Sequence, residues 1–174
     1  MAWFGRRGKD DAATQVDEAE SGGPAEAAAA DLVADSDTLQ PVVEKLGDTE
    51  RARIADALEA LEAEGVDVDN LGSISAGLDA AYRTWEAAPE DARPDHAAIV
   101  ERYAIAIGEH VDRNTDLDWQ VVTDIFGTDL SLTEGFKGSF VVVPHNLVAG
   151  RWMRGETDWV PGVVSHIVRR RSRR

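Results

Sequence analysis

Residues 119–133 read WQVVTDIFGTDLSLT, and this stretch decides the fold class. Alternating side chains over 119–124 and again over 129–133 have the period of a β-strand. Gly127 lies between the two runs, where the chain needs a tight turn. A third run, FVVV at 140–143, is apolar throughout and predicts a buried strand. Because the connections between the runs are short, we expect a three-stranded antiparallel meander.

The segments on both sides of the strands have the period of helices. Apolar side chains recur there every three or four residues, which is the spacing of one helical face. The helices predicted from this spacing cover residues 49–64, 73–87, 94–113, 146–154 and 158–170. Helices grouped before and after consecutive strands indicate an α+β domain rather than a doubly wound sheet.

The two ends of the chain differ from its middle in charge. Residues 10–37 contain nine acidic side chains, no basic one and almost no large apolar one. Burial cannot offset the entropy of ordering such a segment, so residues 1–37 are predicted to be a disordered acidic tail. Residues 169–174 contain five arginines and are interpreted as a basic tail. A single α+β domain of unknown function is expected between them, over residues 38–168.

The overall composition excludes several classes of function. A net charge of −15 argues against general nucleic-acid binding, because phosphates require a positive field. The same charge suits a basic protein partner. No stretch approaches about 18 consecutive apolar residues, so no transmembrane segment is expected. The first residues lack the apolar core of a secretory signal, and there is no cysteine, so the predicted location is the cytoplasm.

Polar side chains near the strands form the candidate binding site. They are Asp124, Asp129, His145, Asn146 and Arg151. Carboxylates that flank a turn ordinarily accept backbone hydrogen bonds, and that is the first interpretation of Asp124 and Asp129. The pair could instead hold a metal or activate water, or one aspartate could form an ion pair with Arg151. His145 follows a strand and could act as an acid or base, or it could cap or pack the next helix.

Several motifs within residues 99–164 occur in a recognisable order. They are IGE at 107–109, WQVVTD at 119–124, FGTDL at 126–130, VVVPHNLVA at 141–149 and RW at 151–152. This order resembles an uncharacterised bacterial domain family, common in actinobacteria, with Trp-Val-Val-x-Asp, Gly-x-Asp and Val-Val-x-Pro-x-Asn-x-Val-Ala patterns. Gly150 departs from the family, which usually has lysine there. The resemblance implies a fold unit and a bacterial source, and it implies no activity.

Two functional hypotheses follow from these patterns. No catalytic constellation, cofactor motif or metal-ligand spacing is complete, so no cofactor and no metal are expected. The main hypothesis is therefore a non-catalytic protein-interaction or regulatory module, with a basic protein as its partner. The alternative is a small-molecule-binding domain or hydrolase with a cleft near Asp124, Asp129, His145 and Arg151. It requires those four side chains to converge.

Overall fold

The computed structural model of the chain describes residues 41–135 and 140–172, and the predicted acidic tail lies outside these ranges. The helices of the described part are α2 (Asp48–Ala63), α3 (Leu71–Ala87), a short 3₁₀ turn η2 (Glu90–Ala92), α4 (Ala97–Asn114), α5 (Pro144–Trp152) and α6 (Val160–Arg171). Its strands are β1 (Val42–Lys45), β2 (Asp118–Asp124), β3 (Gly127–Thr133) and β4 (Val141–Val142). The predicted α+β class is confirmed.

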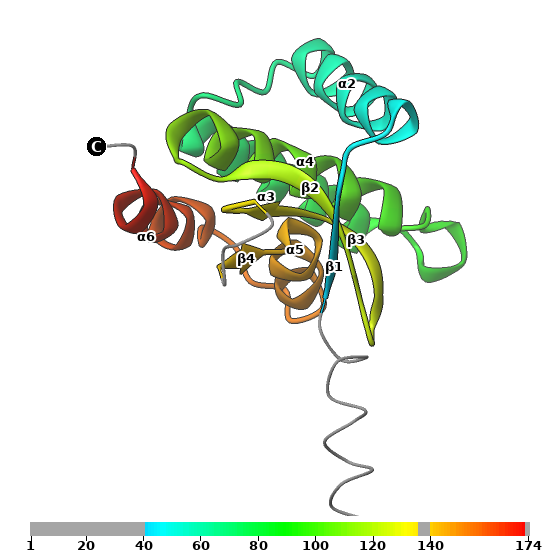
Figure 1. The fold of residues 1–174 in the computed structure, drawn as a ribbon. Coiled ribbons are helices and arrows are strands. Elements are labelled where there is room, and N and C mark those ends of the chain that lie inside the picture. The colour runs from blue at the N-terminus through cyan, green and yellow to red at the C-terminus, as the bar shows by residue number, and fades with distance from the viewer. Residues whose placement is uncertain (1–40, 136–139, 173–174) are drawn as a thin grey trace, which may run out of the picture. The chain divides into compact units, whose positions relative to one another are not determined.

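The four strands form one antiparallel sheet in the order β1-β2-β3-β4 (Figure 1). β2 and β3 pair along their whole length, from Asp118 opposite Thr133 to Asp124 opposite Gly127. β1 pairs with the other edge of β2. The sheet therefore has one strand more than the predicted three-stranded meander. β1 is only four residues long and mostly exposed, so its sequence has no buried face to reveal it. β4 pairs over two residues, less than the predicted run at 140–143.

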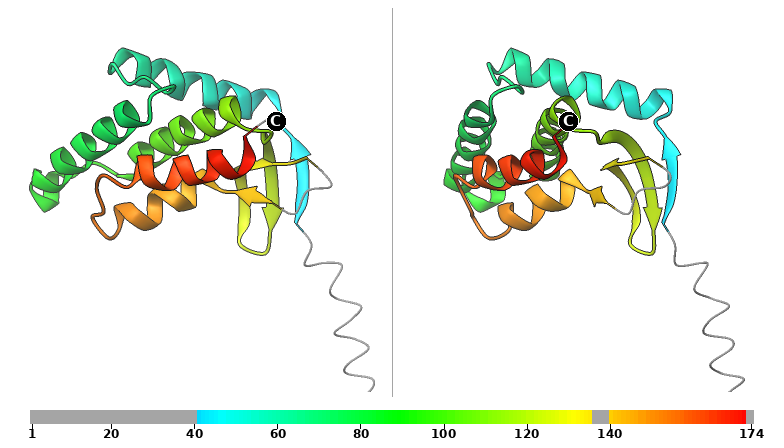
Figure 2. Two further views of the ribbon diagram at one scale, coloured as in Figure 1. Left: turned by 90° about the vertical axis from the view of Figure 1, so that its left-hand side faces the viewer. Right: turned by 60° about the vertical axis from the view of Figure 1, so that its left-hand side comes forward.

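Helix α4 is the centre of the fold. It packs against α2, α3, α5 and α6 and also against β2 and β3. Figure 2 shows the helices gathered to one side of the sheet, with α4 surrounded by the others. Half of its residues are buried, including Tyr103, Ile107 and Val111. Tyr103 is 3% exposed in the core, and this burial raises the pKa of its hydroxyl to about 12.

Local contacts explain where α4 begins and where α6 ends. α4 begins at Ala97 rather than at 94, because the side chain of Asp95 accepts a hydrogen bond from the Ala97 amide at 2.9 Å. At the other end of the chain, α6 continues to Arg171, past the predicted domain end at 168. The guanidinium of Arg171 forms ion pairs with Asp116 and Glu134, so part of the predicted basic tail belongs to the folded domain.

The buried carboxyl of Asp79 joins α3 to the segment before α6. Asp79 is 3% exposed, and its two carboxyl oxygens accept hydrogen bonds from the Asp158 amide at 3.4 and 3.2 Å. Burial raises the pKa of Asp79 above its ordinary value of 3.8, and the hydrogen bond from Asp158 opposes that shift. The folded state therefore disfavours the ionised form of this side chain.

The Asp79→Asn variant is expected to have a higher free energy of unfolding than the wild type at pH 7. The asparagine oxygen still accepts from Asp158, and no charge has to be desolvated. Because the folded-state pKa is raised, the wild type loses stability as pH rises through that pKa. The advantage of asparagine therefore shrinks as pH falls from the raised pKa toward 3.8.

Urea unfolding of both proteins at pH 7 and near pH 4 measures this difference. Asp91→Asn is the matched control, because Asp91 is exposed and is expected to show no such pH-dependent gain. A difference between wild type and Asp79→Asn that is the same at both pH values would contradict the assignment.

Candidate functional site

The structure places Asp124 at the turn between β2 and β3. Its side chain is exposed, and its Oδ1 accepts a hydrogen bond from the Phe126 amide at 2.7 Å. This is the local turn contact that short polar side chains make at such positions. Asn146 is exposed on the first turn of α5.

Two of the predicted site residues come together. Asp129 of β3 and His145 of α5 line one hollow, which Trp119 and the Arg53–Glu101 ion pair also border. The hollow has a volume of about 40 Å³. That is room for a few water molecules rather than for a substrate. Neither Asp124 nor Arg151 lines it.

Arg151 lies in different surroundings. Its Nη1 donates to the Leu147 carbonyl at 3.0 Å, and its guanidinium stacks 4.5 Å from the centre of the Trp159 ring. Its ion pair is with Glu156, at 3.6 Å, and not with Asp124 or Asp129. The single cleft that the small-molecule hypothesis requires is therefore not formed by these four side chains.

The described part of the chain has a much larger hollow beside the C-terminal half of α2. This groove has a volume of about 650 Å³. Its lining comes from Ala55, Leu58, Glu59 and Glu62 of α2, from residues 65–69 of the following loop, and from Arg113 of α4. We call it the acidic groove. Its floor is apolar, with Val66 buried and Leu58 and Val68 half-buried, while Glu59, Glu62, Asp67 and Asp69 are exposed.

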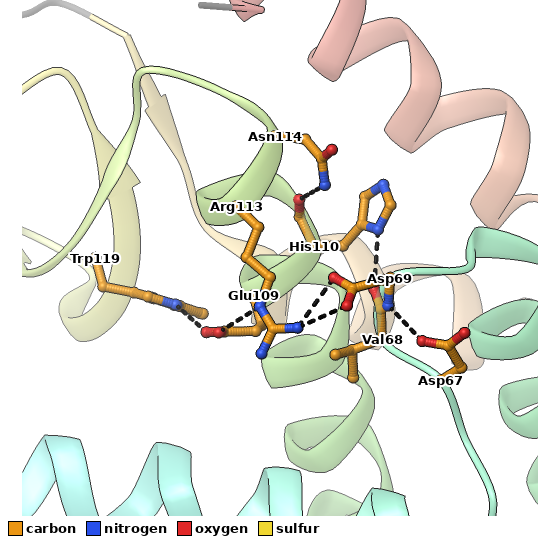
Figure 3. Close-up of polar contacts among 8 residues, drawn as sticks. All are labelled: Asp67, Val68, Asp69, Glu109, His110, Arg113, Asn114 and Trp119. Carbon is orange, nitrogen blue, oxygen red and sulfur yellow. Dashed lines mark hydrogen bonds and ion pairs between the residues drawn. The ribbon is translucent and has the colours of Figure 1, made fainter.

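One wall of the acidic groove is held by Arg113 (Figure 3). Its Nη1 lies 3.0 Å from both carboxyl oxygens of Asp69, and its Nε donates to Glu109 at 2.9 Å. The second oxygen of Glu109 accepts a hydrogen bond from the Trp119 indole at 3.3 Å, which ties the wall to the sheet. The hydrogen bond to Asp69 is the main reason that the pKa of Arg113 is raised.

The loop between α2 and α3 is fixed by further hydrogen bonds. The His110 Nδ1 lies 2.9 Å from the Val68 carbonyl, and the Asp69 amide donates to Asp67 at 2.9 Å (Figure 3). Gly65 turns the chain out of α2 with a φ of 78°, which favours glycine. The wall is thus preorganised, and little entropy would be lost when something binds against it.

The charge of the acidic groove is strongly negative. Among the described residues that line it, Arg113 is the one cationic side chain, and Asp69 and Glu109 already neutralise it. No described residue forms an ion pair with Glu59, Glu62 or Asp67. A second hollow of about 640 Å³ lies along α2, but its arginines pair with acids, Arg53 with Glu101 and Arg102 with Glu64. The second hollow therefore has equal numbers of acidic and basic side chains in its lining, whereas the acidic groove has four acidic side chains and one basic one.

Sequence reasoning did not find this groove. On α2, Glu59 and Glu62 have the spacing of an ordinary solvated helix face, and residues 66–69 read as a short loop. The available signal was VDVD at 66–69, where valine and aspartate alternate directly after Gly65. In the structure the two valines are buried or half-buried, and the two aspartates are exposed.

Comparisons with protein-family models, curated protein sequences and solved structures found no match. The resemblance of residues 99–164 to an uncharacterised bacterial family therefore stays a prediction. Within the described ranges, no helix has both the length and the hydropathy of a membrane span. Nor do three or more histidine, aspartate or glutamate side chains of those ranges gather as ligands of a metal ion would.

Proposed function

We propose that the chain is a protein-interaction module whose acidic groove binds a basic, amphipathic segment of a partner protein. The observation that carries this proposal is the combination of an apolar floor with unpaired carboxylates along the edge. Leu58 and Val68 are half-buried and offer apolar surface, and Glu59 and Glu62 of α2 are exposed beside them in the lining. A segment with apolar side chains on one face and arginine or lysine on the other matches both features.

The two parts of the acidic groove have different roles in binding. Burial of apolar side chains on the floor contributes to the affinity, at about 25 cal/mol per Å². The carboxylates raise the association rate and reject acidic partners, and the net charge of −15 extends this field beyond the groove. Binding is therefore expected to weaken as ionic strength rises.

The double charge reversal Glu59→Lys/Glu62→Lys is expected to weaken binding of a basic amphipathic peptide by about tenfold or more, or about 1.4 kcal/mol. The probe is a fluorescent synthetic peptide with leucines on one helical face and arginines on the other. Fluorescence anisotropy measures its dissociation constant, and the same peptide with glutamate in place of arginine should not bind.

A matched control separates the groove from the general acidity of the chain. Glu90→Lys/Asp91→Lys changes the net charge equally on exposed residues of η2, away from the acidic groove. We expect this variant to bind the peptide within about twofold of the wild type, since the remote charges act through screened long-range fields. Equal losses in both variants would show that net charge alone attracts the peptide, and would contradict the proposal.

A further inference from the structure

The turn between β2 and β3 exposes two large apolar side chains side by side. Ile125 is 65% exposed and Phe126 is 89% exposed. Asp124 pairs with Gly127, so these two residues are the whole turn. Two-residue turns normally contain Asn-Gly, Asp-Gly or another small polar pair. An isoleucine and a phenylalanine there are unexplained by the needs of the turn itself.

Other residues stabilise this turn. Asp124 accepts the Phe126 amide at 2.7 Å, and Gly127 has a φ of 138°, a conformation that favours glycine. One residue further back, the hydroxyls of Thr123 and Thr128 form a cross-strand hydrogen bond at 2.9 Å. The apolar pair is therefore held outward on an ordered hairpin, and little conformational entropy remains to be lost when it is buried by a partner.

The charges of the sheet indicate what kind of surface can receive this tip. The described strands carry four carboxylates and one ammonium group, namely Glu44, Asp118, Asp124 and Asp129 against Lys45. Asp124 is adjacent to the apolar pair. An anionic membrane surface would repel this hairpin, whereas a protein pocket edged by lysine or arginine would attract it.

We propose that the β2–β3 turn is an anchor that inserts Phe126 into an apolar pocket, edged by basic side chains, on a second protein. A single buried aromatic side chain often provides much of the energy of such an interface. Figures 1 and 2 show the turn pointing away from α2, so this surface is separate from the acidic groove. The proposal does not depend on the function proposed for that groove.

Photo-crosslinking tests this proposal in the cells that naturally produce the chain. A photoreactive phenylalanine analogue is placed at position 126, and at position 153 as the control, because Met153 is also strongly exposed, at 74%. We expect a discrete adduct with a second protein from position 126 and none of the same mass from position 153. No adduct from position 126, or an adduct only with another copy of this chain, would overturn the proposal.

The crosslinked protein is then purified, and its binding to the full chain is measured. Phe126→Ala is expected to weaken binding at least tenfold and Met153→Ala less than twofold, with wild-type affinity falling as salt increases. Since both side chains are exposed, both variants should keep the wild-type melting temperature. Equal binding by wild type and Phe126→Ala would overturn the proposal. So would Phe126-dependent sedimentation of the chain with phosphatidylserine vesicles, which would assign the turn to a membrane surface instead.

Discussion

Replacing Gly108 with alanine is expected to destabilise the domain by about 3 kcal/mol, the upper end of the usual cost of overpacking a core. Gly108 faces the sheet from the centre of α4, and a Cβ there would lie 2.2 Å from two atoms of the Trp119 ring. Pro144 of α5 would lie 3.2 Å from it on another side. Trp119 then has to shift, which disturbs the hydrogen bond from its indole to Glu109. The loss of that bond would weaken the wall of the acidic groove.

Urea unfolding of Gly108→Ala measures this loss, and Gly162→Ala is the matched control. Gly162 is also helical, in α6, but a Cβ there would meet no atom within 4 Å. We expect the control to be neutral or more stable by up to about 1 kcal/mol, because alanine favours helix more than glycine does. Equal free energies of unfolding for the two variants would contradict the close packing of Gly108 in α4 against Trp119 in β2.

Truncation of Trp152 to alanine is expected to destabilise the domain by about 3–5 kcal/mol. Trp152 is 4% exposed at the end of α5. Its ring centre lies 5.0 Å from that of Tyr82 and 5.4 Å from that of Trp85, both on α3, and 6.1 Å from that of His96. The indole therefore fastens α5 to α3, and alanine would leave a cavity in this contact.

Trp152→Phe separates packing from hydrogen bonding. The buried Nε1 of Trp152 has no hydrogen-bond partner among the described residues, so phenylalanine would lose no such bond. Phenylalanine is expected to retain at least half of the stability that alanine loses, because a ring still fills most of the site. Thermal unfolding of the wild type, Trp152→Phe and Trp152→Ala measures their order of stability. A phenylalanine variant as unstable as the alanine variant would mean that the indole N–H has a partner.

Strong periodicity explains which parts of the fold could be predicted from the sequence. α2 and α3 have apolar stripes, and their predicted bounds lie within two residues of the observed ones. β2 alternates throughout, and it pairs with β3 as the pattern suggested. β1 has no alternation because both its faces are largely exposed, so no local signal separates it from a loop. Its identity as a strand comes from pairing with β2, a contact distant in sequence.

The candidate site residues were harder to place because their directions depend on tertiary structure. His145 and Arg151 are six positions apart on α5, which points them about 120° apart around the helix axis. The same helix therefore directs His145 toward Asp129 and Arg151 toward Trp159. The acidic groove depends on a helix, a loop and Arg113 that meet only after folding. The helix and the loop follow one another in sequence, but Arg113 is more than 40 residues further on, and none of the three has a diagnostic motif.

The most direct test of the proposed function is a map of where the basic amphipathic peptide binds. The chain is labelled with ¹⁵N, and its amide spectrum is recorded as the peptide is added. The largest chemical-shift changes are expected at residues 58–69 and at the side-chain Nε of Arg113, which line the acidic groove. Changes spread evenly over the exposed acidic residues, with those of η2 shifting as much as those of the groove, would contradict the proposed function.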